Sequence, residues 1–221
     1  MANRSQDHLA GFEMGALAVE GRGKVIWAVG ATEKRRVNGY QLLATVVLFG
    51  IGYLAGAFGS LSFPLSFGVS IFWTGIAVQN VGPIWLGGWG VLVGALFPLL
   101  TNGVVGTPLY ISLAYFPSNA LQALLPALAF RLWKADPRLN SGMDYLVLIA
   151  SITLGNMLGA LYSVLVVLRG YGLIGNESAP MFIWGWFGGN EIAGLILDIL
   201  LLKMISACVI RSPLFVRKRW S

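Results

Sequence analysis

Residues 37–130 begin with VNGYQLLATVVLFGIGYLAGAF (37–58) and end with ALLPALAF (123–130), and none of these 94 residues is Asp, Glu, Lys, Arg or His. A water-soluble domain carries roughly a quarter charged residues, so a charge-free stretch of this length has no face that water would solvate. One helical crossing of the ~30 Å hydrocarbon layer takes about 20 residues. The stretch therefore predicts four transmembrane helices joined by short loops.

The composition of the whole chain fits a single membrane domain. Of its 221 residues, 57% are hydrophobic and 11% are charged, and the mean hydropathy is +0.75. Continuous apolar segments indicate helices rather than a barrel, because barrel strands alternate in polarity. The predicted fold is an all-α bundle of six helices over 40–58, 62–79, 84–100, 109–131, 145–168 and a sixth segment that begins between 181 and 191 and ends near 210.

The basic residues give independent support for six crossings. Ten of the fifteen cations form groups at 34–36, 131–138 and 211–219, each at the end of an apolar segment. With an even number of crossings, all three groups lie on one side, as the positive-inside rule requires. We expect a multi-pass protein of the cell (inner) membrane, with a cytoplasmic or interfacial tail at 1–39, the bundle at 40–210 and a basic cytoplasmic tail at 211–221. No basic stripe is left over to bind nucleic acid.

No group of residues typical of catalysis is evident in the sequence. The chain has one cysteine, Cys208, and one histidine, His8, and it lacks a Walker loop and a Ser/His/Asp set. We therefore expect neither an enzyme, nor a metal site, nor a cofactor.

The last apolar segment carries ionisable residues within its span, which must face the bundle or water. Glu191, with Asn190 beside it, can anchor a ligand in a cavity, or it can be hydrogen-bonded to the 145–168 helix or protonated. For Asp198 the structural role is favoured, because Lys203 and the inner interface are within reach.

Aromatic residues next to Glu191 are further candidates for a binding site. The segment FIWGWFGGN (182–190) places Trp184 and Trp186 among glycines, where they can line a pocket or form an aromatic belt at the interface. Tyr110, Tyr115 and Asn119 in the outer half of the fourth helix can line the same cavity as Glu191. Polar residues such as Asn119, Gln122, Asn156 and Trp73 more often serve as interhelical hydrogen-bonding groups.

Two segments resemble the substrate-binding S-components of energy-coupling-factor (ECF) transporters. They are GPIWLGGWGVLVG (82–94) and NALQALLPALAFR (119–131), which are similar to a glycine-rich third helix and a small-residue fourth helix ending in a cation. The resemblance implies a ligand cavity open to the outside and partners of two kinds, a transmembrane coupling subunit and ATPases. It also implies docking through an Ala-xxx-Ala motif in the first helix, where this chain has Gly52 and Gly56.

Other segments resemble the MASE-type membrane-associated sensor domain. WTGIA (73–77) is similar to that family's Pro-Pro-x-Gly-Ile-Ala segment, and Trp184-Gly185 with GNEIAG (189–194) is similar to its Trp-x-x-Gly-Asp-x-x-Gly motif. We expect a small-molecule-binding membrane protein, the binding subunit of an uptake transporter. The alternative is a sensory or scaffolding module that partners a signalling protein or a larger complex.

Overall fold

The structure is a computed structural model that describes residues 26–28 and 38–218, and over these ranges the protein is mainly helical. Three helices are long and apolar enough to cross a membrane: Gly39–Ser62, Gly142–Leu168 and Ala179–Arg211. These lengths and compositions are typical of a membrane protein. The elements in chain order are α2 (Gly39–Ser62), β1 (Pro64–Ser66), β2 (Val69–Ser70), α3 (Gly75–Leu86), α4 (Gly88–Val104), α5 (Leu109–Ala114), α6 (Phe116–Leu132), α7 (Gly142–Leu161), the π-helix η1 (Tyr162–Leu168) and α8 (Ala179–Arg211).

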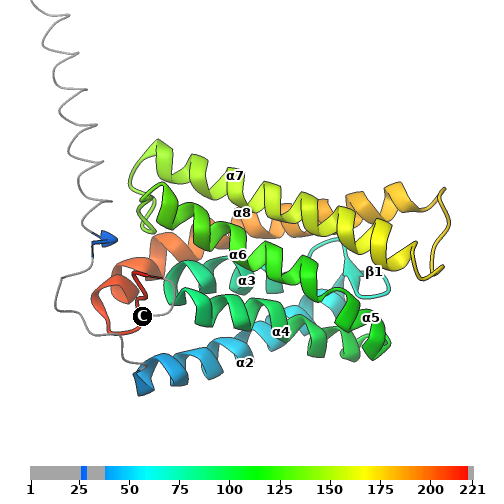
Figure 1. The fold of residues 1–221 in the computed structure, drawn as a ribbon, viewed down its shortest axis with the longest axis horizontal. Helices are drawn as coiled ribbons and strands as arrows, with labels where there is room; N and C mark the ends of the chain where they lie inside the picture. Colours follow the sequence, from blue (N-terminus) through cyan, green and yellow to red (C-terminus); the bar gives the residue numbers. More distant parts are fainter. Residues whose placement is uncertain (1–25, 29–37, 219–221) are drawn as a thin grey trace, which may run out of the picture.

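The helices lie side by side along the long axis of the molecule (Figure 1). Helix α2 follows one side and α7 the opposite side, with α3, α4 and α6 between them (Figure 1). The β1–β2 hairpin and α5 lie together at one end, and the C-terminal segment lies at the other (Figure 1). The start of α2 also lies at the C-terminal end, since the Asn38 side chain donates a hydrogen bond to the Pro213 carbonyl over 3.3 Å.

Helix α2 contains the predicted 40–58 segment and extends beyond it at both ends. It begins at a capping box in which the Asn38 side chain accepts from the backbone N–H groups of Tyr40 and Gln41, and the Gln41 side chain accepts from the Asn38 N–H. Glycines 52, 56 and 59 are buried on one face, where a Cβ atom would clash with Phe97, Thr101 and the backbone of 72–74. Much of the remaining surface of α2 is apolar and exposed.

The prediction of one continuous helix over 62–79 is wrong. The antiparallel β1–β2 hairpin occupies its first part, with a turn at Phe67 and Gly68 that both adopt positive φ values. Helix α3 then runs without a break across residues 80–83, which separate the predicted 62–79 and 84–100 helices, so this predicted boundary is also wrong. Helix α3 ends at Leu86 and is capped by Gly87, whose φ of 58° suits glycine. All twelve residues of α3 are buried. It is therefore an internal helix enclosed by the others, which explains why it can be short and contain Pro83.

Two other predicted helices are interrupted by local backbone changes. The expected 109–131 helix is divided at Tyr115 into α5 and α6, and Pro117 stands in the first turn of α6, where its missing N–H is tolerated. The expected 145–168 helix begins earlier, at a capping box formed by Ser141 and Asp144, and its last seven residues are the π-helix η1. Helix α8 begins at Ala179 and continues without a break through Gly185, Gly188 and Gly189.

The described residues on either side of the bundle, 26–28 and 212–218, pack against its core. Trp27 is buried, its Nε1 donates to the Ala135 carbonyl over 2.8 Å, and its ring lies 5.1 Å from that of Phe215. The Val216 N–H donates to the Trp85 carbonyl over 2.8 Å. Part of the predicted C-terminal tail is thus packed against the helices, whereas most of the predicted 1–39 tail falls outside the described residues.

Candidate functional site

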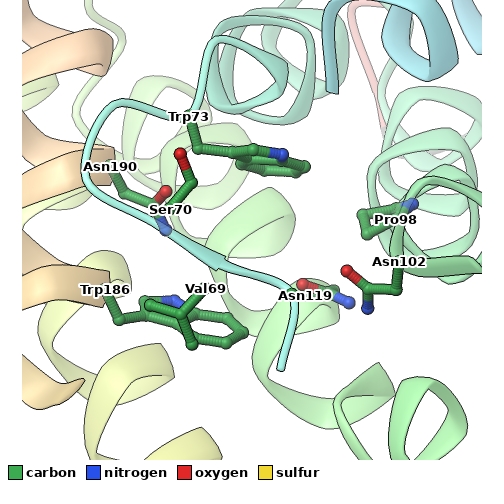
Figure 2. Close-up of a pocket in the computed structure, with 9 residues that line it drawn as sticks. Val69, Ser70, Trp73, Pro98, Asn102, Asn119, Trp186 and Asn190 are labelled. Carbon is green, nitrogen blue, oxygen red and sulfur yellow. The ribbon is translucent and has the colours of Figure 1, made fainter. Parts of the chain in front are cut away.

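A small cavity lies inside the bundle at the hairpin end. Its volume is about 20 Å³, which is room for roughly one water molecule. Trp73 and Trp186 lie on opposite sides of it, with Asn102 and Asn119 at one edge and Asn190 at the other (Figure 2). The lining residues come from the hairpin, the turn after it, α4, α6 and α8: Gly68, Val69, Ser70, Trp73, Pro98, Asn102, Asn119, Trp186 and Asn190.

Helix geometry and close backbone contact bring the lining residues together. Trp186 and Asn190 are four residues apart in α8, so they share one face of that helix. Between them, Gly189 allows the hairpin to lie against α8, because a Cβ atom there would be 2.2 Å from the Ser70 carbonyl oxygen. The Trp73 N–H also donates to the Gly189 carbonyl over 3.4 Å. The segment 69–73 is therefore held directly against the α8 face that lines the cavity.

Two buried hydrogen-bond donors that belong to the cavity wall have no partner among the described residues. They are the indole Nε1 of Trp186 and the amide Nδ2 of Asn119. A buried donor without a partner costs about 1–3 kcal/mol, so a molecule with acceptor atoms gains by entering. None of the residues that line the cavity is charged. The site is suited to an uncharged, acceptor-bearing group held between two aromatic walls.

Three of the seven site residues predicted from the sequence line this cavity: Asn119, Trp186 and Asn190. Tyr115 lies directly behind it, with its ring 5.1 Å from that of Trp186 and its hydroxyl donating to the Phe67 carbonyl over 3.1 Å. Trp184 is 64% exposed and packs edge-on against Phe187, away from the cavity. Tyr110 is 55% exposed and packs against Tyr171. Trp184 and Tyr110 are therefore surface aromatics in this structure.

Glu191 faces α7 and does not line the cavity. Its carboxylate accepts hydrogen bonds from the Thr153 hydroxyl over 2.5 Å and from Asn156 Nδ2 over 2.8 Å. Asn156 in turn accepts from Gln122 Nε2 over 3.0 Å, so the polar chain joins α8, α7 and α6. Of the roles that the sequence left open for Glu191, the geometry matches a carboxylate hydrogen-bonded to the neighbouring helix.

We expect Glu191→Ala to destabilise the bundle rather than to empty a binding site. The substitution leaves the buried Asn156 amide without its acceptor and removes a link between α7 and α8. Interhelical hydrogen bonds in membranes contribute on the order of 1 kcal/mol, which corresponds to a fall of about 3 °C in the melting temperature. The measurement is thermal unfolding of the purified protein, with Glu177→Ala at the exposed end as the matched control. An unchanged melting temperature together with loss of a bound molecule would assign Glu191 to the ligand instead.

Asp198 does not interact with Lys203, the partner that the sequence suggested for its structural role. The Asp198 carboxyl is fully buried and its Oδ2 accepts from Asn80 Nδ2 over 2.8 Å. Lys203 Nζ instead donates to the Leu139 carbonyl over 2.9 Å and lies 5.8 Å from the ring of Tyr145. Asp198 therefore links α8 to the internal helix α3.

Sequence reasoning missed the cavity-lining roles of Trp73, Ser70 and Asn102. Trp73 was assigned to interhelical hydrogen bonding, which it also performs, since its Nε1 donates to the Gly56 carbonyl over 3.2 Å. Within the described residues, no group of three or more His, Cys, Asp or Glu side chains is placed to hold a metal ion. Comparison of the chain with family models, with curated proteins and with solved structures finds no match.

Proposed function

We propose that this protein crosses the membrane six times and binds a small molecule in the cavity between Trp73 and Trp186, as the substrate-binding subunit of an uptake transporter of the ECF type. The observation that carries the binding role is the pair of buried, unpartnered donors, Trp186 Nε1 and Asn119 Nδ2, at the cavity wall. The coupling subunit and ATPases are the partners that such a subunit requires.

The distribution of charge supports six crossings with both ends on the cytoplasmic side. Seven cations and two carboxylates of the described residues belong to the end where α2 starts and α8 finishes: Arg131, Lys134, Arg138, Lys203, Arg211, Arg217 and Lys218, with Asp136 and Asp144. The segment that joins η1 to α8 carries one cation and one carboxylate, Arg169 and Glu177. The positive-inside rule assigns the cation-rich end to the cytoplasm. The cavity, at the hairpin end, then faces outward.

The cavity walls define the class of molecule that we expect. Two indole rings favour a flat apolar or aromatic group, and the amides of Asn102, Asn119 and Asn190 at the edges favour polar atoms on its rim. Since the present volume holds about one water, a larger ligand requires the hairpin to move outward. The turn at Gly68, with its φ of 79°, is the place where the hairpin chain reverses.

The experiment is mass spectrometry of small molecules retained by the purified full chain, comparing wild type with Asn119→Ala. This variant removes an unpartnered donor, so we expect the melting temperature to stay within about 2 °C of wild type. Loss of one or two hydrogen bonds to the retained molecule lowers its retention about tenfold. Trp184→Ala, at an exposed aromatic, is the control and should retain the molecule fully.

Equal retention by Asn119→Ala and wild type would contradict binding in this cavity. A transport role requires in addition that deletion lowers uptake of the identified solute and that the protein co-purifies with ATPases. Unchanged uptake would leave the binding role without the transport role.

The small volume of the cavity favours a second candidate, a MASE-like sensory or scaffolding membrane module. Such a module needs a partner-facing surface more than an open site, and α2 offers a long apolar face of which little is buried. Co-purification separates the two candidates. Recovery of a signalling protein or a larger membrane complex, with no retained small molecule, supports the module.

A further inference from the structure

Two apolar grooves flank α6 in its C-terminal half. The groove on the α4 side has a volume of about 420 Å³ and is lined by Gly87, Gly88, Val91, Leu124, Ala127, Leu128 and Arg131. The groove on the α7 side has a volume of about 470 Å³ and is lined by Leu125, Leu128, Ala129, Leu132, Trp133, Met143, Leu146, Val147, Ala150, Ser151 and Leu154. Leu128 belongs to both, so the two grooves are separated by a single ridge of side chains.

The length of the larger groove matches one leaflet of a bilayer. Along α7 it extends from Met143 to Leu154, twelve residues whose Cα atoms span about 16 Å of helix. Half of the ~30 Å hydrocarbon layer is about 15 Å. Its one hydroxyl, on Ser151, already donates to the Leu148 carbonyl over 2.9 Å, so the wall offers an acyl chain an apolar surface.

One cation lines the smaller groove and another follows the larger groove in sequence, and neither is neutralised by a carboxylate within the described residues. Arg131 lines the smaller groove, and its five N–H groups donate to backbone carbonyls, those of Pro83, Ile84, Ala127, Val216 and Lys218. Lys134 follows Trp133 of the larger groove, is exposed, and makes no ion pair with residues 26–28 or 38–218. These positive charges lie where a lipid headgroup would stand.

The nearby Arg138 is different, because it is neutralised by Asp136 at 2.7 Å. Burial alone would raise the pKa of the Asp136 carboxyl, but the hydrogen bonds and charge of Arg138 outweigh it and the pKa is lowered. Asp136 therefore stays ionised and Arg138 stays paired. Lys134 remains as the exposed cation available to an anion, and Arg131, whose N–H groups are all occupied, adds only its positive charge.

We propose that the two grooves hold the two acyl chains of one anionic phospholipid, which straddles α6 at Leu128 with its headgroup at Lys134 and Arg131. The proposal rests on the membrane crossing proposed above but not on the ligand cavity. A leaflet-long apolar groove on the α7 side of α6 and a shorter one on the α4 side, from Leu124 to Arg131, match the two acyl chains of one lipid, and the nearby cations select a negative headgroup.

The test is native mass spectrometry of the full chain in detergent, mixed with equal amounts of dioleoylphosphatidylglycerol and dioleoylphosphatidylcholine. We expect one phosphatidylglycerol per chain, retained at least about fivefold over phosphatidylcholine. Lys134→Gln should lower that preference about fivefold, as expected for loss of one cation near a headgroup. Its control is Arg169→Gln, which removes a cation from the opposite end.

A second pair of variants tests the grooves themselves. Ala150 is exposed in α7, so Ala150→Trp fills the larger groove from outside and should lower retention of both lipids. Leu200→Trp, at an exposed site of α8 outside both grooves, should leave retention unchanged. Equal retention of the two lipids, or no effect of Ala150→Trp, overturns the proposal. Detection of a dimer of the wild-type protein that is absent in Ala150→Trp also overturns the proposal, because the groove would then be a contact between two copies of the protein.

The experiments also distinguish a failure of the lipid site from a failure of the ligand cavity or of the proposed membrane crossing. Asn119→Ala should keep its phosphatidylglycerol whether or not the cavity binds a ligand. Recovery of the protein from the soluble fraction without detergent would contradict the membrane crossing itself, and the lipid site with it.

Discussion

Replacing Gly90 by alanine is expected to abolish the folded bundle. A Cβ atom at this position would stand 2.3 Å from the carbonyl oxygen of Gly82 and 2.5 Å from the nitrogen of Pro83. Both contacts are with backbone, so no side-chain rotation relieves them. Helix α3 cannot retreat, because all of its residues are buried between other helices. Overpacking of this kind costs about 3 kcal/mol or more, a large share of the stability of a domain.

The measurement is the yield and melting temperature of the detergent-purified protein. Gly103→Ala is the matched control, since it lies in the same helix and its added Cβ would meet nothing within 4 Å. We expect Gly103→Ala to melt at or slightly above the wild-type temperature, because alanine favours the helix. Normal yield and melting of Gly90→Ala would show that α3 and α4 are not in the close contact described.

Arg131→Met is expected to have the next largest effect, because Arg131 joins three parts of the molecule. Its guanidinium donates to carbonyls at the end of α3, in α6 and in the C-terminal segment, over 2.8–3.3 Å. It also lies 4.9 Å from the centre of the Trp27 ring. Methionine keeps the apolar stem and removes all five donors. Hydrogen bonds to charged groups contribute about 1.5–3 kcal/mol each, and we expect a net loss of about 3 kcal/mol because water solvates some of the freed carbonyls.

Two measurements together identify this role. The melting temperature should fall by about 6–12 °C, and limited proteolysis should cut the 212–218 segment faster than in wild type. Arg211→Met, at an exposed cation in the last turn of α8, is the control and should change neither. Lysine at position 131 should restore only part of the loss, since one ammonium cannot reach five carbonyls. Unaltered proteolysis in Arg131→Met would show that the C-terminal segment is held by other contacts.

The candidate site shows where sequence reasoning reached its limit. Trp184 and Trp186 were equivalent by composition and position, yet only Trp186 lines the cavity. In a soluble helix, the apolar stripe marks the buried face. In a membrane helix, the lipid-facing side is as apolar as the core, so hydrophobic periodicity no longer tells the two faces apart. The same reason left open whether Glu191 would meet a ligand or the side chains of Thr153 and Asn156.

The sequence by itself determined the properties that depend on local composition. The absence of charge from residues 37–130 leaves no surface there for water to solvate, and the clustering of cations at segment ends is the basis of the proposed orientation. The caps at Asn38 and Ser141 follow from the residue types at those positions. Each of these properties is set by residues within a few turns of one another.

Only the tertiary structure decided that the second apolar segment becomes a hairpin and an internal helix, and that Trp73 faces Trp186 across a cavity. Hairpin and helix are equally apolar here, and the choice depends on α3 being enclosed on all sides by helices from distant parts of the chain. Such contacts depend on the relative rotation and offset of helices that lie more than a hundred residues apart in the sequence, as α3 and α8 do, and no local pattern encodes them.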